Sequence, residues 1–119
     1  MRVLTRDDER QAALAHEAIA ADFQVTATVL LELEWLLRSA YRWTREQRAL
    51  GLLSLLDLPH AMAYPLHARW AVERMARGAD FADMMHLATA EGAGAFATFD
   101  RRVRKGAGAD APLPVETLL

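Results

Sequence analysis

Short, predominantly apolar runs alternate with longer helical segments along most of this chain. The runs at residues 23–26, 60–64 and 95–99 are bounded by turn or capping residues, as strands are. Strands that lack an alternating polar face are buried on both sides, which is typical of parallel sheets covered by helices. The pattern therefore predicts an α/β sandwich in which a small parallel sheet is flanked by helices.

Helix boundaries follow from capping residues. Thr44 and Gln47 have the spacing of a capping box, and Pro65 suits the first turn of a later helix. A basic turn is expected after residue 100, followed by a proline-flanked segment at 113–118. The expected helices run from Asp7 or Asp8 to about residue 21, from Thr26 or Thr28 to about 41, and over about 44–58, 65–78 and 80 to 92–94.

Size and composition exclude several classes of protein. With 119 residues, of which 53% are hydrophobic, the chain is expected to form one domain over residues 1–119. The formal net charge is only −2 and there is no cysteine, so neither a strongly basic surface nor a disulfide framework is indicated. No apolar window is long enough for a signal peptide core or a membrane span, and a cytoplasmic protein without membrane contact is expected.

Two glutamates on the helix predicted after residue 26 differ in their surroundings. Glu34 and Arg38 form an i,i+4 pair that is expected to be exposed. Glu32 lies at the margin of the apolar face, next to Trp35 and Leu36, with no basic residue at i+3 or i+4. Glu32 is therefore a candidate functional carboxylate, and the alternative is a side chain that reaches past the core into water.

The apolar helix predicted from residue 80 begins with two aspartates. Asp80 is explained as its N-cap, whereas Asp83 has Leu87 as an angular neighbour. A helix dipole contributes about 0.3–1 kcal/mol, less than the several kcal/mol that burial of an unpaired charge costs. Asp83 therefore needs a cation. His86 shares this side of the helix and could join a metal site, or could be a hydrogen-bonded core residue.

Asp100 follows the strand predicted at 95–99, and ligands of open α/β sheets collect beyond the carboxyl ends of strands. The alternative for Asp100 is a turn residue that starts the next segment. The basic cluster that comes next could neutralise phosphates, with Arg101 and Arg102 as the candidate RNA contacts, although a solvated run of charge is the commoner explanation; the cluster consists of Arg101, Arg102, Arg104 and Lys105. Carboxylates without cysteine suit Mg²⁺ or Mn²⁺, which also bind substrate phosphates, so the combination points to phosphodiester hydrolysis.

Three segments in this order resemble the PIN-domain family, specifically the VapC-like toxins of bacterial toxin–antitoxin pairs. They are Val-Leu-Leu-Glu-Leu-Glu-Trp-Leu-Leu at 29–37, Gly-Ala-Asp-Phe-Ala-Asp-Met-Met-His-Leu-Ala at 78–88 and Thr-Phe-Asp at 98–100. The similarity extends over practically the whole chain. It implies a Mg²⁺- or Mn²⁺-dependent ribonuclease with a PIN-like three-layer sandwich, usually a homodimer, inhibited by a cognate VapB-like antitoxin.

The resemblance also assigns roles by position. It implies that Glu32, Asp83 and Asp100 are catalytic residues and metal ligands, that Asp80 is an accessory acid, and that Thr98 is the hydroxyl residue beside the site. The family pattern begins with a central apolar strand ending in Asp-Thr-Asn, and this chain lacks it. The hypothesis is that Met1 lies inside a longer protein, through truncation or a misplaced start codon, and that the 119-residue form cleaves RNA poorly.

Two further hypotheses stay open. The chain could be a catalytically impaired PIN module that mainly binds an antitoxin partner or dimerises, with Tyr41, Trp43 and Trp70 in apolar contact surfaces. Alternatively, it could be an unrelated α/β domain whose acidic residues lie far apart. The positions of Glu32, Asp83 and Asp100 in the structure bear on these hypotheses.

Overall fold

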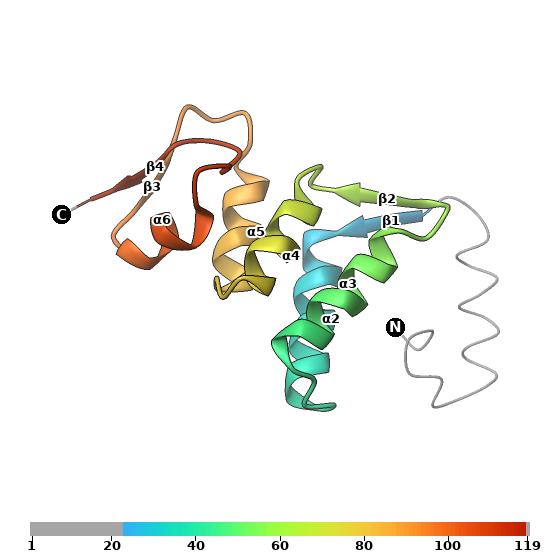
Figure 1. The fold of residues 1–119 in the computed structure, drawn as a ribbon. Coiled ribbons are helices and arrows are strands. Elements are labelled where there is room, and N and C mark those ends of the chain that lie inside the picture. Colours follow the sequence, from blue (N-terminus) through green and yellow to red (C-terminus); the bar gives the residue numbers. More distant parts are fainter. Residues whose placement is uncertain (1–22, 119) are drawn as a thin grey trace, which may run out of the picture.

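The computed structural model describes residues 23–118, which form a mixed α/β structure (Figure 1). The helix expected over residues 7–21 lies outside this part of the chain. The elements in chain order are β1 (Phe23–Thr26), α2 (Ala27–Ser39), α3 (Arg45–Leu56), β2 (Ala61–Tyr64), α4 (Ala68–Ala76), α5 (Phe81–Thr89), β3 (Phe96–Thr98), α6 (Arg101–Ala107) and β4 (Val115–Thr117). None of the helices within residues 23–118 combines the length and apolar character that a membrane span requires.

Side-chain caps at predicted residues fix where α2 and α3 begin, whereas α4 has no side-chain cap and begins at Ala68, later than the predicted start at Pro65. Thr26 accepts a hydrogen bond from the Val29 N–H at 3.3 Å and starts α2. At α3 the Thr44 hydroxyl accepts from the Gln47 N–H at 3.1 Å while the Gln47 side chain accepts from the Thr44 N–H at 2.8 Å. This reciprocal capping box satisfies two of the backbone donors that a helix start leaves unpaired.

The strands form two separate parallel pairs. β1 pairs with β2, with Phe23 opposite Ala61, and β3 pairs with β4, with Phe96 opposite Val115. Small parallel sheets flanked by helices are therefore confirmed. The expected single sheet is divided in two, because no strand within residues 23–118 pairs with both β1–β2 and β3–β4. Figure 1 shows the two pairs at opposite ends of the helical layer.

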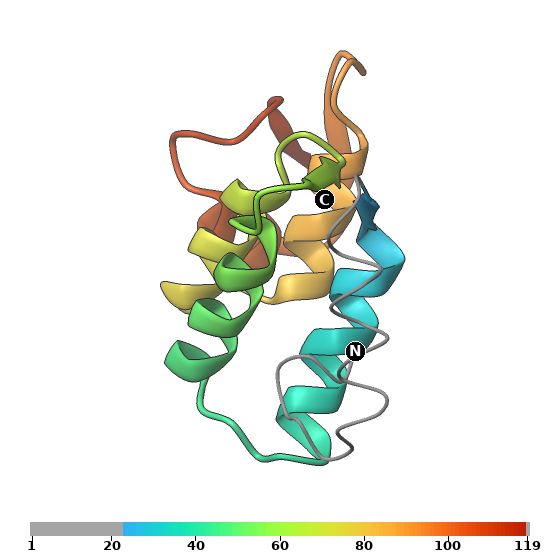
Figure 2. The same cartoon turned by 90° about the vertical axis from the view of Figure 1, so that its right-hand side faces the viewer.

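The core lies among α2, α3, α4 and α5 (Figure 2). Each of these helices contacts two of the others, so α2 packs on α3 and α5 while α4 packs on the same two helices. Fully buried side chains from all four helices fill the centre, and they include Leu30, Leu52, Val72 and Leu87. The core holds the N-terminal end of α5 in place, and this end carries Asp80 and Asp83.

The basic segment after Asp100 is a helix, whereas the sequence predicted a turn. Asp100 is the N-cap of α6, and its Oδ1 accepts a hydrogen bond from the Arg102 N–H at 2.9 Å. A capping carboxylate stabilises the first turn of a helix, and Val103 and Ala107 on the opposite face are buried. Capping and burial together make this short charged segment helical.

Candidate nucleic-acid and metal site

A cavity of about 440 Å³ lies where the turn between α4 and α5 faces α6, and we call it the α4–α6 cavity. Its wall combines cations and carboxylates, which sets it apart from an ordinary apolar pocket. The carboxylates are Asp80 and Asp83, from the start of α5. The charged lining is completed by Arg45, Arg74, Arg77, Arg102 and Lys105.

Asp80 and Asp83 are placed by the start of α5. Asp80 is the N-cap, as the sequence predicted, and its Oδ1 accepts from the Asp83 N–H at 2.9 Å. Burial raises the pKa of Asp83 above its usual value of 3.8, and the negative charges of Asp80 and Asp100 raise it further. Arg102 and His86 act in the opposite direction without restoring the ordinary pKa. Burial and the neighbouring aspartates therefore outweigh the nearby positive charges in their effect on the pKa of Asp83.

Asp100 stands beside these two residues from a different part of the chain. The Thr98 hydroxyl accepts a hydrogen bond from the Asp100 N–H at 3.1 Å, so Thr98 orients the Asp100 backbone. Arg102 donates to the Asp100 carboxylate from Nε at 3.0 Å and from Nη2 at 2.8 Å. These hydrogen bonds hold the pKa of Asp100 below its usual value. Arg101 is exposed and carries no such contact.

The structure brings together three of the four predicted acidic residues. We call Asp80, Asp83 and Asp100 the acidic cluster, because the charges of Asp80 and Asp100 both act on Asp83. Glu32 is exposed on α2 and lines a different hollow, together with Trp35. In the part of the chain that the structure describes, no three His, Cys, Asp or Glu side chains are arranged to hold a metal ion.

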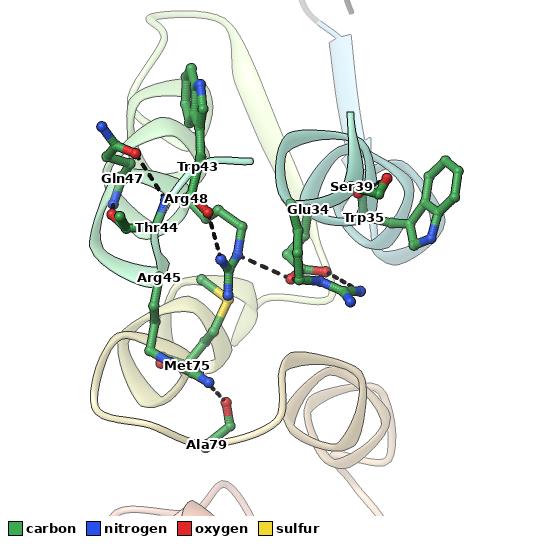
Figure 3. A network of polar contacts seen from close by, with 11 residues as sticks. Glu34, Trp35, Ser39, Trp43, Thr44, Arg45, Gln47, Arg48, Met75 and Ala79 are labelled. Carbon is green, nitrogen blue, oxygen red and sulfur yellow. Dashed lines mark hydrogen bonds and ion pairs between the residues drawn. The ribbon is translucent and has the colours of Figure 1, made fainter. Parts of the chain in front are cut away.

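Glu34 occupies the buried position on α2, and the prediction of an exposed pair was wrong in this respect (Figure 3). The residue is only 7% exposed. Its carboxylate pairs with Arg38 Nε at 3.0 Å, as predicted, and also with Arg48 Nε at 3.2 Å from the neighbouring helix α3. Arg48 donates in addition to the Trp43 carbonyl at 2.8 Å. Arg48 is a second cation, and it lowers the free-energy cost of burying Glu34. Because Arg48 belongs to α3, helical geometry within α2 could not reveal this pair.

Arg45 supports the turn that carries the acidic residues, and sequence reasoning missed it. One Nη1 atom donates to the Met75 carbonyl and to the Ala79 carbonyl, each at 2.9 Å (Figure 3). The sequence does contain a signal, because a cation at the first position of a helix opposes the helix dipole and needs another reason to be there. Arg74 plays a similar part toward α6, since its Nε donates to the Gly106 carbonyl at 2.7 Å.

The structure combines small parallel sheets flanked by helices with aspartates gathered beside a basic cavity. The sequence model of the PIN domain matches residues 1–109, and the chain belongs to the PIN-domain family. PIN domains are generally nucleases that bind nucleic acid and typically use divalent metal ions. No curated protein and no solved structure matches the chain.

Proposed function

We propose that this protein is a metal-dependent endoribonuclease, the toxin of a VapBC-like toxin–antitoxin pair, contained in one domain over residues 1–119. The observation that carries the nuclease proposal is the state of Asp83. It is a partly buried carboxylate with two further aspartates beside it, and its pKa is raised first by burial and then by their negative charges. A divalent cation would neutralise the negative charge of these aspartates, and the members of this family are generally nucleases.

The donor set fits a hard divalent ion. Mg²⁺ is commonly held by one or two carboxylates and completes its shell with water and substrate phosphate, so Asp83 and Asp100 would hold it, with Asp80 as the accessory acid. Bound there, Mg²⁺ or Mn²⁺ would lower the pKa of a water molecule and stabilise charge on the leaving oxygen. Thr98 positions Asp100 through its backbone N–H. Glu32 is proposed as a further ligand and catalytic residue on the family resemblance alone.

Cleavage of total RNA by the purified protein tests this proposal. We expect cleavage with Mg²⁺ or Mn²⁺ and none with a chelator, and we expect Asp83→Asn to abolish it. Asp110→Asn is the matched control, because Asp110 is an exposed aspartate outside the acidic cluster. Cleavage that survives both the chelator and Asp83→Asn would exclude the acidic cluster as the catalytic centre.

A second candidate function is a binding module without catalysis. Large apolar side chains are exposed on β2 and just after it, namely Met62, Tyr64 and Leu66, and Trp35 on α2 is 59% exposed. Exposed apolar groups of this kind suit contact with a VapB-like antitoxin or a second copy of the chain. Coexpression with the neighbouring gene product separates the two proposals. Toxicity relieved by the partner favours the nuclease, whereas a stable complex without toxicity favours the module.

A further inference from the structure

The cations of the α4–α6 cavity fall into two groups. Arg45 and Arg74 donate to backbone carbonyls, and Arg102 is paired with the Asp100 carboxylate. Arg77 and Lys105 are exposed, and their side chains have neither a hydrogen bond nor an ion pair within residues 23–118. The first group stabilises the walls of the cavity, and the second group leaves two cationic side chains available to a ligand.

The positions of Arg77 and Lys105 favour an anion that enters from solvent. Arg77 follows the last turn of α4 and Lys105 lies on α6, so the two positive charges reach one cavity from opposite walls. Neither residue is among the charges that act on Asp83, which are those of Asp80, Asp100, Arg102 and His86. Both side chains are exposed, and no ion pair within residues 23–118 neutralises them, so both can pair with an anion from solvent.

We propose that Arg77 and Lys105 form a binding site for a backbone phosphate of single-stranded RNA, next to the phosphate that is cleaved at the acidic cluster. The inference rests on the proposed ribonuclease function and extends it to substrate binding. A cavity of about 440 Å³ is large enough for part of a nucleotide. Asp80 and Asp83 line the same cavity as these two cations, so a polyanion can place one phosphate near the metal ligands and a neighbouring phosphate on the cations.

The test measures binding without cleavage. Fluorescence anisotropy with a labelled single-stranded oligoribonucleotide in EDTA gives the affinity of the full 119-residue chain at several salt concentrations. Each phosphate contact contributes about 0.7 to the slope of log affinity against log salt for single strands. The double variant Arg77→Gln, Lys105→Gln loses this one phosphate contact, so it is expected to reduce the slope by about 0.7 and to weaken binding about fivefold at 0.1 M salt.

Control variants keep the test specific. Arg104→Gln removes the same charge from the same helix as Lys105, at an exposed position that does not line the α4–α6 cavity, and should leave the slope nearly unchanged. The charge-conserving variant Arg77→Lys, Lys105→Arg should retain most of the slope. An equal loss in Arg104→Gln, or an unchanged slope in the double variant, would overturn the proposal. Because the assay contains no metal, a protein that binds RNA as expected but never cleaves it would refute the proposed function alone.

Discussion

Glu34 on α2 and Asp83 on α5 are both carboxylates that are partly or largely removed from solvent, but the charges around them differ. Glu34 is met by Arg38 and Arg48, whereas Asp83 is met by two more aspartates. A buried charge that has its own counter-ions holds the structure together. We propose that a partly buried carboxylate with further aspartates beside it, such as Asp83, binds a cation from outside. On this proposal, the charges around a carboxylate separate a structural one from a functional one more clearly than its burial does.

The largest expected effect comes from removing the charge of Glu34. Glu34→Gln leaves the Arg48 side chain, which is 10% exposed, without its carboxylate partner, and breaking a buried ion pair in this way costs about 3 kcal/mol. The free energy of unfolding from urea titration measures the loss. Glu32→Gln is the matched control on the same helix, since Glu32 is exposed and its neutralisation should change stability by less than about 0.5 kcal/mol. Equal losses in the two variants would remove the distinction between these glutamates.

The next effect concerns the turn that presents the acidic cluster. Arg45→Gln removes a charged donor from the Met75 and Ala79 carbonyls, and the expected loss of stability is about 2 kcal/mol. We also expect faster hydrogen exchange of the amides around Ala79 than in the unaltered protein. Arg42→Gln, at an exposed arginine just before α3, should change neither quantity. Unchanged exchange in Arg45→Gln would show that the turn is held by other contacts.

A smaller effect is expected at the start of α3, the helix that supplies both Arg45 and Arg48. Thr44→Ala removes the hydroxyl that accepts from the Gln47 N–H, and loss of such a cap costs about 1 kcal/mol. Urea titration again provides the measurement. Thr44→Ser keeps the hydroxyl and should restore most of the stability. A loss in the serine variant as large as in the alanine variant would point to packing of the methyl group instead of capping.

Much of the fold could be predicted from the sequence because its signals are local. The Thr44–Gln47 capping box and the N-cap at Asp80 depend on residues within one helical turn, and both were confirmed. The burial of Glu34 could not be predicted in the same way, because it depends on Arg48, which α3 supplies from across the helix interface. The division into two strand pairs depends on pairing between distant segments, which no local pattern specifies.

For the candidate site, too, the sequence identified residues that carry a local signal and missed those that depend on tertiary contacts. Motif spacing identified Asp80, Asp83 and Asp100, and the structure brings these three together. Motif spacing gives no signal for Arg77, because the proposed role of Arg77 depends on sharing a cavity with Lys105 on another helix. The sequence also predicted that Glu32 joins the site, and this stays a prediction that Glu32→Gln can test through RNA cleavage. Residues that act through tertiary contacts were the ones that sequence reasoning missed.

The smallest expected effect concerns Asp83, the second carboxylate of the comparison, and is a change in the stability of the metal-free protein. Because the pKa of Asp83 is raised on folding, the unfolded chain ionises this group first as the pH rises above 3.8, and the folded state loses stability until its own Asp83 has ionised. Asp83→Asn removes this loss. At pH 7 with EDTA the variant should be more stable by about 0.5 kcal/mol, the scale of a like-charge pair one helical turn apart.

The pH dependence of this gain distinguishes relief of charge from other causes. Urea titrations should show no difference between Asp83→Asn and the unaltered protein well below pH 3.8, a gain that grows above it, and a constant gain at neutral pH. Adding Mg²⁺ should reverse the order at neutral pH, since only the unaltered protein retains Asp83 as a ligand. A variant that is less stable than the unaltered protein in EDTA would mean that Asp83, like Glu34, already has its counter-ion within the fold.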